Sequence, residues 1–322
     1  MTAAAIAEEP EFRGDGALTT LAMGSKTFAF AGWFLPADRR ADAALLYTFC
    51  RYVDDIGDDS ADLTAAREEL TRVQRELLGA EARPLVAALL AMFARRGVKP
   101  EYAVELVHGV LSDLDGVRVA DDAELLRYCY RVASTVGLMM CGVLGVSDPA
   151  ALPHAIDLGL AMQLTNICRD VKEDAKNGRI YLPSSRMKVA GFVGGPGELL
   201  TAREPVRRVV ADLLALAERY YRSGDEGLGA IPVRTRFAIV VASRVYRAIG
   251  LRLLALGGDP LVGRTVVPLF SKLVWAARAA AHFIGGLFAP PALRPHDPSL
   301  HVLLVGLPAA DAPPEEKVRC TA

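Results

Sequence analysis

The sequence predicts an all-α protein that forms a single helical bundle around a central apolar cavity. Apolar residues recur at helical spacing along long segments, and strand-like alternation bounded by hairpin turns is absent. Hydrophobic residues make up 52% of the 322 residues, which is enough to bury a large core. These observations indicate helices packed on helices rather than on a sheet.

Proline and glycine mark where the expected helices begin and end in the first part of the chain. These helices span residues 17–34, 38–58, 62–80, 84–96 and 101–115. Proline has a fixed φ and no N–H to donate, so it is tolerated in a first turn, and it stands at or near three starts, at Pro36, Pro84 and Pro100. Glycine stands just past two ends, at Gly97 and Gly116.

Five further helices are expected over residues 122–145, 150–175, 198–223, 235–256 and 260–285. They are marked by Pro149 and Pro260 near starts and by Gly257 past an end. Residues 176–197 are rich in glycine and proline and are expected to form the longest internal loop. The chain is therefore expected to divide into a flexible N-terminus over 1–16, one helical domain over 17–289 and a proline-rich mobile tail over 290–322.

Charge and cysteine content narrow the function classes. Lysine plus arginine (37) nearly equal aspartate plus glutamate (38), so no basic field exists to hold nucleic acid. The five cysteines show no C-x-x-C pairing, and no signal peptide precedes them, which favours reduced thiols in the cytoplasm. The five histidines include no i, i+4 pair, so a zinc or other imidazole site is not expected. Any metal is expected to use oxygen ligands.

The end of the 38–58 helix carries a first acidic motif. Asp54 and Asp58 are four residues apart, so they lie about 40° apart on the helix surface and can reach one cation. Tyr47 and Arg51 extend the same stripe upstream. Carboxylates near a helix C-terminus are disfavoured by the macrodipole, which predicts a compensating positive charge.

The 150–175 helix carries a second acidic motif. Gln163, Asn166, Asp170 and Asp174 are spaced by three, four and four residues and share one face. Amide and carboxylate oxygens are the ligands that Mg²⁺ prefers, and Mg²⁺ completes its shell with water and substrate phosphate. Two acidic faces therefore predict a metal-diphosphate site. Further candidate phosphate donors lie downstream, at Arg179, Tyr181, Arg234, Arg236, Tyr246 and Arg264.

A solvated acidic surface is the alternative interpretation of both motifs. The neighbouring segments argue against it, because Asp157 is the only charge over 155–164 and residues 132–146 have none.

The 122–145 helix has small residues that can admit a ligand or allow tight helix packing, and packing is the favoured interpretation. These residues are Ala133, Ser134, Gly137 and Gly142. Tyr128 alone is more typical of a core phenol than of a catalytic one.

The order of these motifs resembles the squalene/phytoene synthase family, the head-to-head isoprenoid condensing enzymes, over roughly residues 20–275. Matching segments span residues 24–28, 35–36, 47–58, 128–137, 163–174, 178–183, 246–249 and 263–273. The resemblance implies an isoprenoid-synthase-type bundle. Two departures stand out: Ser134 replaces the usual glycine and is expected to add a hydroxymethyl group to the cavity wall, and Gly57 lies inside the first motif.

The resemblance also implies roles for individual residues. Metal and diphosphate binding is implied for the residues Asp54, Asp58, Asn166, Asp170 and Asp174. Positions near the diphosphates are implied for Ser25, Tyr47, Arg51, Gln163, Arg169, Tyr246 and Arg264, to which the downstream donor Arg179 is added. Tyr128 matches a tyrosine that handles protons or cations. The implied cofactor is Mg²⁺, with Mn²⁺ as an alternative.

The implied reaction joins two geranylgeranyl diphosphates into phytoene through a cyclopropylcarbinyl diphosphate. Squalene or dehydrosqualene synthesis from farnesyl diphosphate is the nearest alternative, and only reductive squalene synthesis needs NADPH. A head-to-tail prenyltransferase or terpene cyclase also uses D-D-x-x-D, but the second motif argues against one. A non-catalytic assembly or membrane adaptor is a further alternative, against which the intact aspartates speak.

A cytoplasmic location with peripheral contact to the inner membrane is expected, because substrate tails and product are oily. Residues 266–287 are apolar apart from four polar or charged positions and are consistent with an amphipathic surface helix or with an ordinary core helix.

Overall fold

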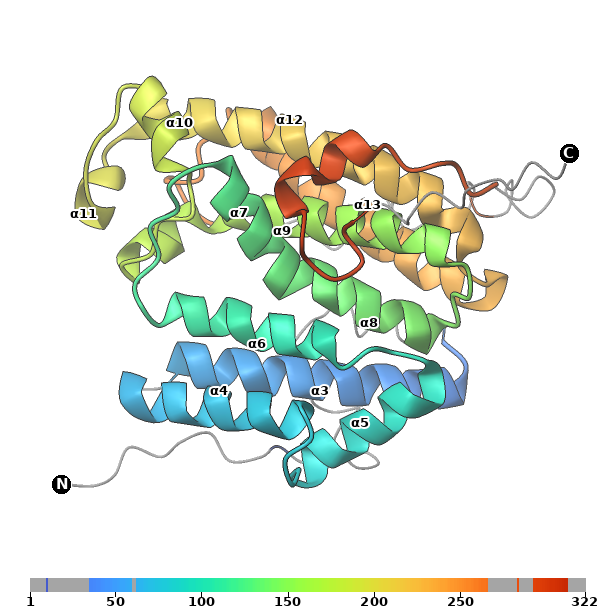
Figure 1. Ribbon diagram of the computed structural model, residues 1–322. Coiled ribbons are helices and arrows are strands. Elements are labelled where there is room, and N and C mark those ends of the chain that lie inside the picture. The colour runs from blue at the N-terminus through green and yellow to red at the C-terminus, as the bar shows by residue number, and fades with distance from the viewer. Residues whose placement is uncertain (1–9, 11–34, 60–61, 266–282, 284–291, 312–322) are drawn as a thin grey trace, which may run out of the picture.

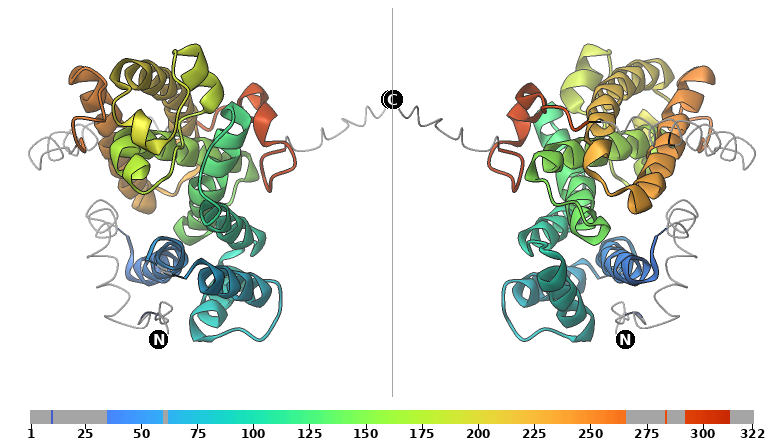
Figure 2. Two further views of the ribbon diagram at one scale, coloured as in Figure 1. Left: turned by 90° about the vertical axis from the view of Figure 1, so that its left-hand side faces the viewer. Right: turned by 90° about the vertical axis from the view of Figure 1, so that its right-hand side faces the viewer.

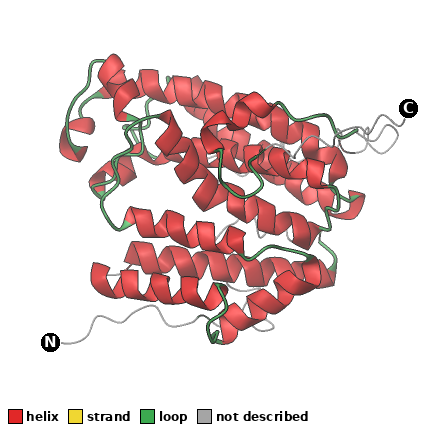
Figure 3. Ribbon diagram, in the orientation of Figure 1, coloured by secondary structure: helices red, strands yellow, loops and turns green. Residues whose placement is uncertain are grey.

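The computed structural model describes residues 10, 35–59, 62–265, 283 and 292–311 of the chain. Over these residues the fold is all-α, as predicted, and Figure 3 shows helices and loops without a strand. An isolated parallel bridge between Arg118 and Ile180 is the one extended pairing in this part of the chain. The expected helices over 17–34 and over most of 260–285 lie outside the described residues; residues 260–265 themselves are not helical.

The helices are α3 (Ala37–Asp59), α4 (Leu63–Leu77), α5 (Pro84–Arg96), α6 (Glu101–Asp113), α7 (Asp122–Cys129), α8 (Thr135–Leu144), α9 (Leu152–Lys176), α10 (Ser184–Val189), α11 (Pro196–Leu199), α12 (Arg203–Gly227) and α13 (Val233–Ala255). Their bounds differ from the sequence expectation mainly over 176–197. That segment was expected to be one loop, but it contains α10, whose Met187 is buried, and the start of α11.

Helix α9 is the centre of the bundle. It packs against α8, α12 and α13, and its buried residues extend from His154 to Ala175. Helices α3, α4, α5 and α6 form a neighbouring group, which contacts the rest mainly through α8 and the residues just before it (Figures 1 and 2). The C-terminal ends of α3 and α9 each carry one acidic motif.

The segment expected as one helix over 122–145 changes its winding in the middle. Residues Tyr130–Ser134 form a π-helical turn between α7 and α8. The wider turn allows Tyr130 to donate a hydrogen bond outward to the carbonyl of Pro308 (2.5 Å) while Val132 and Ala133 line the central cavity. Such π turns occur frequently at functional sites, because they re-aim side chains within a continuous helix.

Two glycines permit close packing of the motif helices. A Cβ at Gly159 of α9 would lie 2.5 Å from the Cα of Ser134, and a Cβ at Gly57 of α3 would lie 2.6 Å from Val110 Cγ1. Ser134 is fully buried and donates to the carbonyl of Ile156 (2.7 Å). The expectation that its hydroxymethyl group extends the cavity wall is therefore wrong, because the hydroxyl is used in the contact between helices.

Residues 292–311 pack onto the bundle rather than forming the expected mobile tail. They include the 3₁₀ helix η4 (Pro298–Leu304), which lies beside α7 in Figure 1. Leu304, Leu307 and Ala310 are buried in the main core, and this burial offsets the entropy lost on ordering the segment. The rest of the expected tail, residues 312–322, lies outside the described residues.

Candidate active site

The two acidic motifs line one polar pocket. Asp54 and Asp58 enter it from α3, and Asp170 and Asp174 enter it from α9. Gln163 and Asn166 line the same pocket, about two turns and one turn upstream of Asp170, respectively. Residues more than 100 positions apart in the sequence therefore face a common space, which the solvated-surface interpretation does not explain.

An apolar cavity of about 350 Å³ continues from the polar pocket into the bundle. Asp54, Val132, Gln163 and Asn166 line both spaces, so they mark the passage between them. The cavity is far larger than one water molecule needs. Its walls include the uncharged segments that the sequence indicated, with Val136, Gly137 and Met140 from α8 and Leu158, Gly159 and Met162 from α9.

The carboxylates of the pocket repel one another and are poorly solvated. Burial, followed by the charge of Asp58, raises the pKa of Asp54 to about 7. Burial, followed by the charge of Asp170, raises the pKa of Asp174 to about 7. Among the described residues, five carboxylates and one guanidinium line the pocket. The donor set therefore needs additional positive charge.

Asn166 supplies an independent indication that a cation fits here. Its Oδ1 atom is buried and has no hydrogen-bond partner among the described residues, although its amide nitrogen donates to Gln163 Oε1 (3.3 Å). A buried acceptor without a partner costs about 1–3 kcal/mol. The carboxylates and this amide oxygen are hard ligands suited to Mg²⁺ or Mn²⁺.

Three arginines approach the acidic groups. Arg179, from the loop after α9, pairs with Asp58 of α3 (2.7 Å) and so bridges the two motifs. Arg169 forms a two-pronged pair with Asp170. Arg264 lies 3.0 Å from Asp170 and 3.7 Å from Glu173. All three were predicted as diphosphate donors, and each now holds a carboxylate that a substrate or cation would compete for.

Asp113, at the end of α6, is a pocket residue that sequence reasoning missed. Tyr128 and Tyr181 each donate a hydrogen bond to it (both 3.0 Å), and their rings stack with centroids 4.9 Å apart. Burial raises the pKa of Asp113 to about 6, although the two tyrosine hydrogen bonds oppose that shift. A lone aspartate at a helix end gives no motif, so only the fold reveals it.

Several predicted residues lie elsewhere. Tyr47 and Tyr246 line the apolar cavity rather than the acidic pocket, and burial raises the pKa of each. Arg51 lines neither space; it is half exposed and pairs with Asp55 (2.5 Å). Ser25 lies outside the described residues.

Arg236, a further candidate phosphate donor, has a structural role instead. Its guanidinium donates hydrogen bonds to the carbonyls of Gly229 and Ile231 (both 2.9 Å) and so connects their turn to α13.

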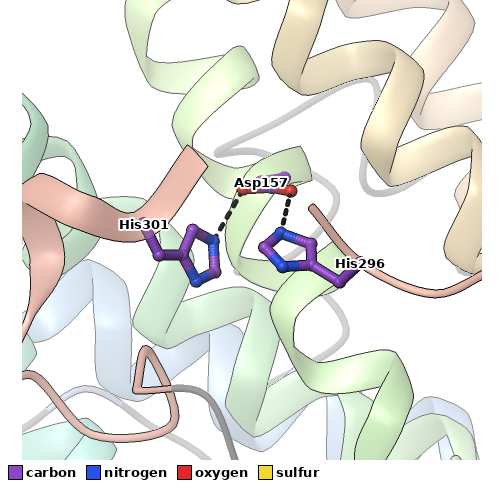
Figure 4. A group of neighbouring side chains, drawn as sticks. All are labelled: Asp157, His296 and His301. Atoms are coloured by element: carbon purple, nitrogen blue, oxygen red, sulfur yellow. Dashed lines mark hydrogen bonds and ion pairs between the residues drawn. The ribbon is translucent and has the colours of Figure 1, made fainter. Parts of the chain in front are cut away.

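A second polar cluster lies toward the other end of α9, around Asp157 (Figure 4). His296 and His301 both contact its carboxylate. His154, one turn earlier, lines the cavity and binds the carbonyl of Arg294 (2.9 Å). His154 thus meets two histidines that lie more than 140 positions away in the sequence, and the only sequence signal was the H-x₄-H spacing of His296 and His301.

The chain is similar to proteins of one known family. Residues 21–271 match the protein family described as squalene/phytoene synthase. A phytoene synthase of Pseudescherichia vulneris is 41% identical over 259 residues, which cover 76% of this chain and 84% of that protein. A 15-cis-phytoene synthase of Enterobacter agglomerans is 34% identical over 287 residues, covering 85% and 97%.

Solved structures agree with the fold. A ligand-bound dehydrosqualene synthase superposes with a TM-score of 0.73 at 25% identity and covers 84% of this chain and 95% of that one. A squalene synthase from Alicyclobacillus acidocaldarius superposes with a TM-score of 0.66 at 24% identity, covering 76% and 94%. The all-α arrangement is therefore common to all three chains.

Proposed function

The chain belongs to the squalene/phytoene synthase family, and we propose that it is a phytoene synthase, a prenyltransferase that condenses two geranylgeranyl diphosphates head to head. The observation that carries this proposal is the junction of the two spaces: an acidic pocket opens directly into an apolar cavity. The pocket suits a metal-bound diphosphate, and the cavity suits the attached hydrocarbon.

Divalent metal would be held by Asp54, Asp58, Asn166, Asp170 and Asp174. When bound, Mg²⁺ would neutralise the diphosphate and stabilise the charge that develops as the carbon–oxygen bond breaks. Mn²⁺ has a similar ligand preference. The proposal rests on the raised pKa values of Asp54 and Asp174 and on the unpartnered oxygen of Asn166.

The arginines would take the remaining charge of the leaving group. Arg179 would exchange Asp58 for diphosphate oxygens, and Arg169 and Arg264 would do the same from Asp170. Guanidinium forks match phosphate oxygens, so the exchange retains paired hydrogen bonds. Ser25, Tyr47, Arg51, Gln163 and Tyr246 are proposed as further diphosphate-side residues on the basis of the family resemblance.

Carbon–oxygen cleavage sends the bonding electron pair out with diphosphate and leaves an allylic cation. Water would quench that cation, so the reacting carbons must lie in the dry cavity lined by α8, α9 and α13. The double bond of the second chain attacks instead, and loss of a proton gives cyclopropylcarbinyl diphosphate. A second ionisation and proton loss gives phytoene. Tyr128 and Asp113 line the pocket, where they would handle the protons that these two steps release.

Squalene or dehydrosqualene synthesis from farnesyl diphosphate is the second candidate, because the structural neighbours carry those names. NADPH would enter only for reductive squalene synthesis. The phytoene synthases at 34–41% identity favour phytoene.

Peripheral membrane contact is proposed because substrate and product are oily. Among the described helices, none has the length and apolar character needed to cross a membrane.

Product identification tests the proposal. Purified protein is incubated with Mg²⁺ and either geranylgeranyl or farnesyl diphosphate, and the hydrocarbon is identified by mass spectrometry. Phytoene from the longer substrate supports the assignment. A hydrocarbon from farnesyl diphosphate alone would move the protein to the second candidate, and release of diphosphate without any coupled hydrocarbon would overturn both.

A further inference from the structure

The Asp157 cluster is built from two distant parts of the chain. Asp157 comes from the first half of α9, and His296 and His301 come from the C-terminal segment over residues 292–311 (Figure 4). Thirteen residues separate Asp157 from Asp170, which places the cluster about 20 Å along the helix from the acidic pocket. It belongs to neither the diphosphate site nor the reaction proposed above.

The side chains converge closely. Nε2 of His301 lies 2.8 Å from Oδ1 of Asp157, and Nε2 of His296 lies 2.8 Å from Oδ2. One ligand atom from each residue falls within 4.8 Å of the others. Asp157 is fully buried, and the His296 side chain is only 11% exposed. A buried carboxylate with two converging imidazoles needs positive charge nearby.

The hydrogen bonds of His301 indicate what lies between the ring and the carboxylate. Its Nδ1 atom faces the carbonyl oxygen of Ala310 (3.2 Å), which can only accept, so Nδ1 carries the proton of the neutral ring. Nε2 then presents a lone pair to Asp157. Two acceptors at 2.8 Å repel each other unless a second proton or a metal ion stands between them.

We propose that Asp157, His296 and His301 bind a structural Zn²⁺ ion that fastens the C-terminal segment to α9. Imidazole nitrogen and carboxylate oxygen are typical zinc ligands, and His296 and His301 have the H-x₃₋₅-H spacing of zinc sites. Mg²⁺ disfavours imidazole, so this ion is chemically distinct from the one proposed at the acidic pocket. Water would complete a four-coordinate shell.

The surroundings resemble the outer shell of a metal site. A ligating histidine usually donates its other N–H to a carbonyl or carboxylate, as His301 does to Ala310. A ligating carboxylate is usually hydrogen-bonded in turn, and Ser223 of α12 donates to Asp157. Ligand atoms on a tetrahedral zinc ion lie about 3.4 Å apart, given bonds of ~2.1 Å. The 2.8 Å separations would therefore widen slightly through side-chain rotation.

The test measures metal directly, without an activity assay. Protein purified from zinc-supplemented cells without chelator is expected to hold about one zinc ion per chain by elemental analysis. Addition of ZnCl₂ to metal-free protein, in excess MgCl₂ to occupy the acidic pocket, is expected to raise the Tm by about 4 °C at 100-fold excess over Kd. Cobalt chloride should give the visible absorption of four-coordinate Co²⁺.

Variants separate this site from other metal sites. His296→Gln, which replaces the most exposed ligand, and Asp157→Asn should both lose the zinc, the Tm response and the cobalt spectrum. His108→Gln, at a histidine on α6 that contacts Gln74 and Glu105, should keep all three, as should Asp170→Asn in the acidic pocket. Wild-type protein without stoichiometric zinc or a zinc-dependent Tm would overturn the proposal in favour of a proton-mediated contact. Zinc retained by both ligand variants would also overturn it.

Discussion

Nη1 of Arg179 lies 2.7 Å from Oδ1 of Asp58, and this ion pair joins the loop after α9 to the end of α3. It spans 121 positions in the sequence and connects the two acidic motifs across the pocket. The guanidinium thus occupies a place where a diphosphate and its cation would compete for the same carboxylate. Substrate binding would therefore have to break this ion pair.

Arg179→Ala should lower kcat/KM by roughly 10-fold or more, equivalent to ~1.4 kcal/mol, because the leaving group loses a forked donor. Arg179→Lys keeps the charge but not the fork and should restore only part of the rate. Steady-state kinetics with geranylgeranyl diphosphate provide the measurement. Arg118→Ala, at an exposed arginine that contacts the carbonyl of Gly194, is the control. Equal rates for Arg179→Ala and this control would contradict the assigned role.

Asp170→Asn should reduce turnover by about 100-fold or more and raise the Mg²⁺ concentration needed for half activity, because one charged ligand is lost. Glu173→Gln is the matched control on the same helix, since its carboxylate is half exposed and lies outside the pocket lining. A Mg²⁺ titration of initial rates distinguishes the two variants. The metal assignment fails if Asp170→Asn keeps the wild-type Mg²⁺ dependence.

The pH dependence of stability should report the carboxylates that share the pocket. The pKa values of Asp54 and Asp174 are raised to about 7 in the folded chain, so between roughly pH 4 and pH 7 the folded state binds more protons than the unfolded one. Stability without Mg²⁺ should therefore fall as pH rises through this range.

Mg²⁺ binds the deprotonated carboxylates, so it should raise the Tm more at pH 8 than at pH 5. Thermal unfolding at both pH values, with and without MgCl₂, gives the comparison. The variant Asp54→Asn should reduce the difference between the two pH values. An equal Mg²⁺ effect at pH 5 and pH 8 would show that these carboxylates do not bind the ion.

Asp113→Asn should lower kcat and remove the ionisation near pH 6 from the pH–rate profile, because the shared acceptor of Tyr128 and Tyr181 loses its charge. Asp115→Asn is a close control, since Asp115 is exposed and pairs with Arg67 (2.6 Å). The profile should be recorded with saturating Mg²⁺. If both variants keep the wild-type profile, Asp113 serves packing alone.

Ala155→Phe should shift substrate preference from the C₂₀ toward the C₁₅ diphosphate. Ala155 lines the cavity and precedes Asn166 by eleven residues on α9, about 16 Å along the helix, so a phenyl group there shortens the space for a prenyl chain. The ratio of kcat/KM for the two substrates is the measurement. Ser134→Ala should leave this ratio unchanged, since its hydroxyl bonds Ile156 outside the cavity lining.

The fold class and the composition of both acidic motifs follow from the amino-acid sequence alone. Helical spacing is a local property, so the positions of Asp54 and Asp58, or of Asp170 and Asp174, on one helix face could be read directly. Prolines and glycines gave the bounds of α5 exactly and of most other helices closely. The uncharged stretches of α8 and α9 likewise predicted an apolar wall, which the cavity lining confirms.

Which groups from distant parts of the chain come into contact depends on the packing of the helices. Asp113 joins the pocket because α6 ends beside Tyr128 and Tyr181, whereas Arg51 pairs with Asp55 one turn away and does not line the pocket. His296 and His301 reach Asp157 because residues 292–311 bury apolar side chains against the bundle. Helical spacing describes only residues that are close in the sequence, so it cannot predict such contacts. The free energy of these contacts depends on burial and charge pairing between segments that are far apart in the chain.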